Sequence, residues 1–260
     1  MDRLCKKEGG GSAMIKVFIF SYSQDQEEAV ECARSVLLAV PGCVVTVADD
    51  AADPVSEETM FYLHQLGVRC VRTVWPRHGN LRGRDCIQGI LATMAEGVND
   101  EDIVVKIDCD TVILDGDWLR WMDGKRNVPL YASGDFKGGE WRVYGCCYAL
   151  KGWLVKRLLA EINWEMLDGN APEDWTIGKE VFERCPVPLC RIVEPWRQCC
   201  PWSDWTAWNW FSTTADVNSY AERFAVVTVG NPRQDWQVPS ERARVMRQLI
   251  DAKERLRLPI

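Results

Sequence analysis

The sequence has only two histidines, no pair of cysteines in a C-x-x-C arrangement and no long run of apolar residues. A membrane-spanning helix needs roughly 18 or more consecutive apolar residues, and the N-terminus also lacks the apolar core of a secretion signal. Because His64 and His78 are the only imidazoles, a structural zinc site would lack its usual ligand spacing. These absences predict a cytoplasmic protein with no transmembrane segment and no structural zinc.

A surplus of positive charge is also missing, because 31 lysines and arginines stand against 38 aspartates and glutamates, which gives a net charge of −7. Proteins that bind nucleic acid through its phosphate backbone normally present a basic face. We therefore expect no nucleic-acid partner, although one phosphate-bearing small ligand is compatible with this charge. The 12 cysteines lie mostly inside apolar runs, as reduced thiols in a protein core do.

What the sequence does contain is an alternation of two apolar patterns along its first half. Short, β-branched and aromatic runs are typical of strands buried on both faces, and apolar residues at helical spacing lie between them. Strands are expected at 15–20, 43–48, 70–75 and 103–107, and helices at 25–39, 57–66 and 85–95. Such alternation implies right-handed crossovers, and it predicts an α/β fold with a doubly wound, mostly parallel sheet.

The rest of the chain has a different sequence pattern and no internal repeat. Residues 1–13 end in a glycine-rich stretch without periodicity, so we expect a flexible leader ahead of a single domain over residues 14–260. A tryptophan-dense segment, WRQCCPWSDWTAWNWF, covers 196–211. Further elements are expected as a strand at 141–150 and helices at 153–161, after Pro172 and near 240–255.

Two aspartates follow the last predicted strand of the first half, in the run KIDCDTVIL at 106–114. Asp108 and Asp110 would point the same way in extended backbone, because the strand period is two. Their mutual repulsion favours either a solvated turn or a bound cation, and Mg²⁺ or Mn²⁺ commonly bridges carboxylates to substrate phosphates. Ligands of doubly wound sheets collect at the carboxyl ends of strands, so we favour Asp108 and Asp110 as metal ligands.

This D-x-D pair at a strand end resembles the corresponding motif of the GT-A fold glycosyltransferases, which transfer a sugar from a nucleotide diphosphate donor. The order of elements is similar over most of residues 14–260. The runs YGCCYALKGWLVKRLL (144–159) and APEDWTIGKEVFE (171–183) also look like a pattern of the Fringe-like and related β-glycosyltransferases. The resemblance implies a GT-A fold, with a nucleotide-sugar-binding half over 14–115 and an acceptor-side half over 116–260.

The same resemblance implies an inverting hexosyltransferase that uses a UDP-sugar and a divalent metal, Mn²⁺ or Mg²⁺, to glycosylate a glycan or another hydroxyl acceptor. By motif position, Asp174 is the general base that deprotonates the acceptor, and Glu173 lies beside it. A carboxylate in a partly desolvated site suits that role, because its pKa can rise toward its working range. An ordinary helix start after Pro172 is the alternative interpretation, since the helix dipole favours acids in a first turn.

Donor contacts are expected at the other strand ends, again by resemblance. In the family, the loop after the first strand and the acid after the second contact the base and ribose. The segment RHGNLRGRD (77–85) resembles a family loop, and its arginines could hold the diphosphate through paired, charged hydrogen bonds. Surface salt bridges are the alternative for each residue. The candidates are Ser21, Tyr22, Asp50, Asn80 and Arg84, with Arg82 in the same loop.

Two features leave parts of this interpretation open. Many metal-dependent members supply a C-terminal histidine ligand, whereas this chain reads VVTVGNP at 226–232, so Asn231 or water would complete the metal shell. Trp202 and Trp205 would receive a glycan acceptor by stacking, or they pack an irregular subdomain. The alternatives are a nucleotide-sugar- or glycan-binding protein without catalysis and, less favoured, a sugar nucleotidyltransferase, whose glycine-rich loop is missing from FIFSYSQDQ (18–26).

Overall fold

The structure is a computed structural model that describes residues 13–75, 81–125, 127–193, 206–207, 216–229 and 239–257. The first half alternates β1 (Ile15–Ser21), α1 (Gln26–Ala39), β2 (Val44–Asp50), α2 (Glu57–Gln65), β3 (Arg69–Thr73), α3 (Arg84–Ala95) and β4 (Ile103–Asp108). It is followed by β5 (Thr111–Ile113), α4 (Asp117–Asp123), β6 (Leu130–Lys137), β7 (Glu140–Lys151), α5 (Gly152–Glu161), α6 (Glu173–Arg184) and β8 (Arg191–Val193). The last elements are β9 (Thr206–Ala207), α7 (Val217–Arg223), β10 (Val226–Thr228) and α8 (Pro239–Arg257). The strands and helices predicted from sequence are confirmed to within two residues at their ends.

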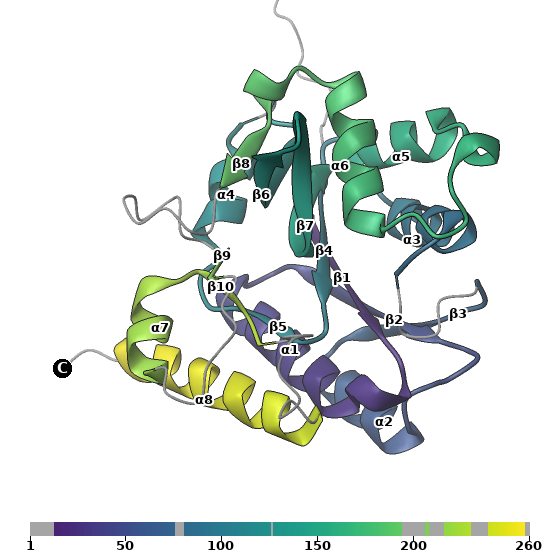
Figure 1. Cartoon of the computed structure of the whole chain (residues 1–260). Helices are drawn as coiled ribbons and strands as arrows, with labels where there is room; N and C mark the ends of the chain where they lie inside the picture. Colours follow the sequence, from purple (N-terminus) through teal and green to yellow (C-terminus); the bar gives the residue numbers. More distant parts are fainter. Residues whose placement is uncertain are drawn as a thin grey trace, which may run out of the picture.

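A seven-stranded sheet in the order β3-β2-β1-β4-β7-β6-β8 forms the centre of the described structure (Figure 1). The strands from β3 to β4 are parallel to one another, as predicted. β7 then runs antiparallel to β4, and β6 runs antiparallel to β7. β6 and β7 form a hairpin whose turn contains Gly138 and Gly139. Both glycines have a positive φ, a backbone conformation that glycine adopts at no steric cost.

Helices cover both faces of this sheet because its central strands are apolar on both sides. Val17 and Ile19 of β1 pack in one hydrophobic core with α1 and α8, whereas Phe18 and Phe20 pack in a second core with α3 and α5. Figure 1 shows α1 and α8 on one side of the molecule and α3 and α5 on another. The predicted doubly wound architecture is therefore confirmed.

A smaller sheet has the strand order β5-β10-β9. Its strand β5 is the element that follows β4 along the chain. β10 pairs antiparallel with β5, with Thr228 opposite Thr111. This pairing brings a segment from the C-terminal part of the chain to the turn that follows β4.

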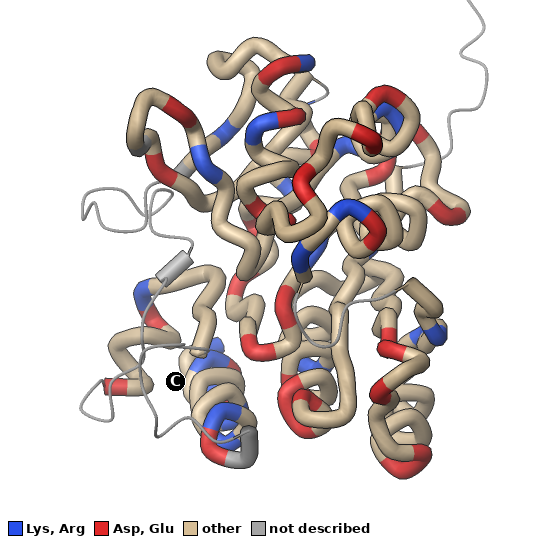
Figure 2. Tube along the Cα trace, turned by 45° about the vertical axis from the view of Figure 1, so that its right-hand side comes forward, with Lys and Arg blue, Asp and Glu red and all other residues tan. Residues whose placement is uncertain are grey.

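The helix α8 is attached to α1 by ion pairs. Arg34 of α1 lies 3.0 Å from both Asp251 and Glu254, and Arg247 of α8 lies 2.7 Å from Glu31. Figure 2 shows lysine and arginine positions spaced along α8. Neither α8 nor any other helix among the described residues is long and apolar enough to span a membrane.

Candidate active site

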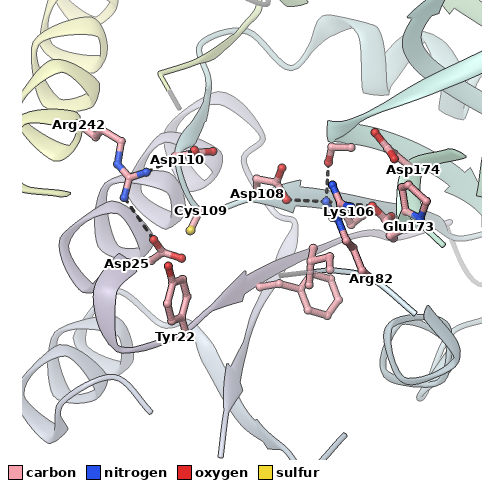
Figure 3. Close-up of a pocket in the computed structure, with 14 residues that line it drawn as sticks. Tyr22, Asp25, Arg82, Lys106, Asp108, Cys109, Asp110, Glu173, Asp174 and Arg242 are labelled. Atoms are coloured by element: carbon pink, nitrogen blue, oxygen red, sulfur yellow. Dashed lines mark hydrogen bonds and ion pairs between the residues drawn. The ribbon is translucent and has the colours of Figure 1, made fainter. Parts of the chain in front are cut away.

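A cavity of about 320 Å³ opens at the carboxyl ends of β1 and β4. Ligands of such sheets bind at this edge. The start of α6, the loop before α3 and the start of α8 complete its wall (Figure 3). Its charged lining residues are Asp25, Arg82, Lys106, Asp108, Asp110, Glu173, Asp174 and Arg242.

Asp108 and Asp110 both line this cavity, although the backbone between them is not extended as expected. Asp108 is the last residue of β4, and Cys109 and Asp110 form a turn before β5. The chain turns here because β5 leaves the large sheet to pair with β10. Burial and, next, the charge of Asp108 raise the pKa of Asp110 to about 7. The repulsion between the two acids is therefore a property of the folded site.

Lys106 supplies a buried cation next to this pair. Its side chain is 1% exposed, its Nζ atom lies 2.5 Å from Asp108 Oδ1, and it donates a hydrogen bond of 2.5 Å to the carbonyl oxygen of Gly145. Glu173 Oε2 lies 3.6 Å from the same nitrogen. Burial lowers the pKa of Lys106, but the charges of Asp108 and Glu173 outweigh burial and raise it, so the ammonium stays charged. The sequence analysis assigned Lys106 no role. A lysine within a strand that is buried on both faces nevertheless indicates a paired, buried charge, because lysine is rarely buried without a partner.

The acidic pair at the start of α6 meets this lysine from the other side (Figure 3). Glu173 and Asp174 lie in the first helical turn after Pro172, where the helix dipole favours acids. Glu173 is 3% exposed and accepts a hydrogen bond from the hydroxyl of Tyr148. Burial raises the pKa of Glu173 to about 7 and also raises that of Asp174. A Cβ at Gly145 would lie 3.2 Å from the Cβ of Asp174, so glycine at this position of β7 leaves room for α6.

A second cation reaches Asp110 from α8. The guanidinium of Arg242 lies 4.0 Å from Asp110 Oδ2, 2.9 Å from Glu28 Oε1 and 3.5 Å from Asp25 Oδ1. Figure 3 shows it between Asp25 and Asp110. Sequence reasoning missed Arg242 because α8 carries several arginines, and only the docking of this helix on α1 distinguishes one from the next.

The segment after β10 arrives where the resemblance predicted a C-terminal metal ligand. The amide of Val229 donates a hydrogen bond of 2.9 Å to the carbonyl oxygen of Asp110. Asn231, the predicted substitute for histidine, lies outside the described residues. In the part of the chain that the structure describes, no three His, Cys, Asp or Glu side chains gather in an arrangement that could hold a metal. Two carboxylates together with substrate phosphates are nevertheless a common way to bind Mg²⁺.

The predicted nucleotide contacts at the strand ends occupy two kinds of position. Tyr22 lines the cavity directly. Ser21 and Asp50 are buried at the carboxyl ends of β1 and β2 and do not line it. Asp50 accepts a hydrogen bond of 2.9 Å from the amide of Ala52, so its carboxylate also shapes the loop after β2.

The loop before α3 brings Arg82, rather than Arg84, to the cavity. Arg82 forms an isolated antiparallel bridge with Pro172, which ties this loop to the start of α6. The next residue, Gly83, has a φ of 85°, and a Cβ there would lie 2.4 Å from the carbonyl oxygen of Gly169. The remaining predicted site residues, Asn80, Trp202 and Trp205, lie outside the described residues.

Comparison with known proteins identifies the fold. No protein-family profile and no curated protein sequence matches the chain. Among solved structures, the galactosyltransferase LgtC, in complex with donor and acceptor sugar analogs, matches with a TM-score of 0.55 and 16% identity over 94% of this chain and 97% of LgtC. The bifunctional glycosyltransferase WbbM matches with a TM-score of 0.54 and 11% identity over 95% of this chain and 52% of WbbM.

A weaker likeness, with a TM-score of 0.47 and 16% identity, covers 95% of this chain and 81% of glucosyl-3-phosphoglycerate synthase from Mycobacterium tuberculosis, in complex with Mn²⁺ and UDP. The likeness to LgtC and WbbM establishes that this chain has the GT-A fold, as the resemblance implied. It does not test the Fringe-like pattern around Asp174, which stays a prediction.

Proposed function

We propose that the protein is a hexosyltransferase that moves a sugar from a UDP-sugar to a hydroxyl group of a glycan or another acceptor. The observation that carries this proposal is the presence of Asp108 and Asp110 in the same cavity as Asp174. The GT-A fold supports it, since LgtC, which has this fold, is a galactosyltransferase. In this proposal residues 14–115 bind the nucleotide sugar and residues 116–260 form the acceptor side.

Donor recognition would fall to the side of the cavity next to β1 and the loop before α3. Tyr22 lies there, and the guanidinium of Arg82 can pair with a diphosphate through charged hydrogen bonds. Ser21 and Asp50 are buried next to the cavity without lining it, and they would act indirectly by holding the ends of β1 and β2 in place. Asn80 and Arg84 complete the proposed set of donor-side residues.

A divalent cation, Mn²⁺ or Mg²⁺, fits Asp108 and Asp110 at the end of β4. Burial and the charge of Asp108 raise the pKa of Asp110 to about 7, and the positive charge of a bound cation would offset the repulsion between the two acids. Asp108 and Asp110 would hold the ion through carboxylate oxygens, the donors that these metals prefer. When bound, the ion supplies positive charge that stabilises the leaving diphosphate. Arg242 already carries positive charge beside Asp110 and would share that role.

Asp174 would act as the general base. Its carboxylate takes the proton of the acceptor hydroxyl while the hydroxyl oxygen forms a bond to the anomeric carbon. The bond from that carbon to the diphosphate oxygen breaks, and its electron pair leaves with UDP, so attack from the opposite face inverts the anomeric centre. Burial raises the pKa of Asp174 toward a useful range, while the Trp175 amide and Lys106 stabilise its charged form.

Calorimetry with UDP and Mn²⁺, followed by an assay of UDP release from UDP-sugars with a panel of mono- and disaccharide acceptors, tests the proposal. We expect UDP to bind the unaltered protein and Asp110→Asn to weaken this binding. Asp174→Asn should bind UDP normally and lose transfer, and NMR of the product should show an inverted anomeric centre. Full transfer by either variant contradicts the site assignment. UDP binding with no turnover of any UDP-sugar would indicate a binding protein instead.

A further inference from the structure

We infer that a second cavity beside the first is the acceptor subsite and that it takes an uncharged sugar ring; this inference rests on the proposed function. The second cavity has a volume of about 270 Å³. That volume is near the lower end of small-molecule sites, which begin at about 300 Å³. Its walls come from the start of β7, the segment before α6 and the first turns of α6, and they include Glu140, Trp141, Arg142, Asp168, Trp175 and Lys179.

The first turn of α6 separates the two cavities. Pro172 lines both of them, Glu173 and Asp174 line only the first, and Trp175 lines only the second. A ligand in the second cavity therefore contacts the residue that directly follows the proposed base. This placement suits the body of an acceptor whose reacting hydroxyl must reach Asp174.

Two indole rings contribute to the apolar part of the second cavity, together with Met166, Leu167, Ala171 and Pro172. Trp175 is 45% exposed, and the guanidinium of Arg142 lies 3.8 Å from the centre of its ring. Trp141 is held from outside the cavity by Phe136 and Phe182, with ring centres 5.3 and 6.2 Å away. Aromatic side chains with polar groups nearby suit a ligand that has both an apolar face and polar groups. A sugar ring is such a ligand, because its C–H groups form an apolar face and its hydroxyls are polar.

The charged groups around these rings point to an uncharged ligand. Glu140 and Asp168 provide two acids, and Arg142 and Lys179 provide two cations. Sugar hydroxyls can donate hydrogen bonds to carboxylates and accept them from cations, so they satisfy both kinds of group. A ligand with a net charge of either sign would meet repulsion as well as attraction in this cavity.

Saturation-transfer NMR with methyl β-galactoside, methyl β-glucoside and lactose, in the presence of UDP and Mn²⁺, tests this inference. We expect at least one of these sugars to bind, and we expect Trp175→Leu to raise its apparent Kd by about tenfold or more. Trp121→Leu is the matched control, because Trp121 is 36% exposed and lines neither cavity. Arg142→Gln should also raise the Kd, and it provides a second test if Trp175→Leu fails to fold.

The inference is overturned if none of the three sugars binds, if the substitutions in the second cavity leave the Kd unchanged, or if glucuronic acid binds better than the neutral sugars. UDP calorimetry on the same proteins separates this failure from that of the proposed function. If UDP binds and the sugars do not, only the acceptor subsite is wrong. If UDP does not bind the unaltered protein, the proposed function fails.

Discussion

The Nζ atom of Lys106 lies 2.5 Å from the Oδ1 atom of Asp108, at the end of the central strand β4. The same ammonium faces Glu173 of α6 at 3.6 Å, so one buried cation serves acids from two elements. We expect Lys106→Met to lower the free energy of unfolding by about 3–5 kcal/mol, because it leaves the buried carboxylate of Glu173 without its cation. Urea denaturation followed by circular dichroism measures this loss.

A double variant separates the ion pair from the packing of the lysine side chain. Lys106→Met combined with Glu173→Gln removes both charges, so it should be less destabilised than the sum of the two single variants. A strictly additive loss would show that Lys106 and Glu173 do not stabilise each other.

Most of the fold was predictable from sequence because buried parallel strands and the helices between them leave strong periodic patterns. The run IVVKI at 103–107 is an example, and β4 lies there. Periodicity does not carry strand order or direction, so the antiparallel position of β7 between β4 and β6 could not be predicted. The turn at Asp110 was missed for the same reason, because it depends on β5 pairing with a strand more than a hundred residues away.

The candidate site was predictable only where a motif marks it. Asp108, Asp110 and Asp174 stand in recognisable patterns, and the fold brings all three to one cavity. Arg242 stands in no pattern, because a helical arginine near Glu28 and one in open solvent look alike in sequence. Its place at the site follows from tertiary docking alone.

Arg242 should contribute to donor binding if the proposed function is correct. Its guanidinium lies beside Asp110 in the cavity, and charged hydrogen bonds to a diphosphate are among the stronger ones. We expect Arg242→Gln to weaken UDP binding by about tenfold or more, measured by calorimetry. Arg247→Gln is the matched control, because Arg247 pairs with Glu31 on the same two helices but does not line the cavity. Equal UDP affinities for the two variants would remove Arg242 from the site.

Glu28 should make the stability of the protein depend on pH. Burial raises its pKa from 4.5 to about 7 in the folded state despite its contact with Arg242. The folded protein therefore holds this proton more tightly than the unfolded chain, so the contribution of Glu28 is full below pH 4.5 and is lost as the pH rises through 7. Between these values the unaltered protein should lose stability relative to Glu28→Gln, by at most about 1.4 kcal/mol per pH unit.

Urea denaturation of both proteins at several pH values, with a chelator present, measures this difference. A difference that is constant, or that shifts in favour of the unaltered protein as the pH rises, would contradict the raised pKa of Glu28.

A side chain at Gly83 should destabilise the protein. Its φ of 85° disfavours other residues, and an added Cβ would lie 2.4 Å from the carbonyl oxygen of Gly169. Gly97 also has a positive φ, of 64°, but has open space around it. We expect Gly97→Ala to cost about 1–2 kcal/mol and Gly83→Ala to cost more, since only the latter adds a clash. Thermal melting compares the two, and equal losses would show that the loop before α3 moves freely away from Gly169.

Arg242 and Asp25 contact each other across 217 positions of sequence. Closing a loop of that length costs more entropy than forming a hairpin or a helix, so contacts of this kind form late. During synthesis, Asp25 and Asp110 leave the ribosome long before α8 can dock on α1 and bring Arg242 to them. Until α8 docks, the pocket therefore lacks the positive charge that Arg242 places beside Asp110.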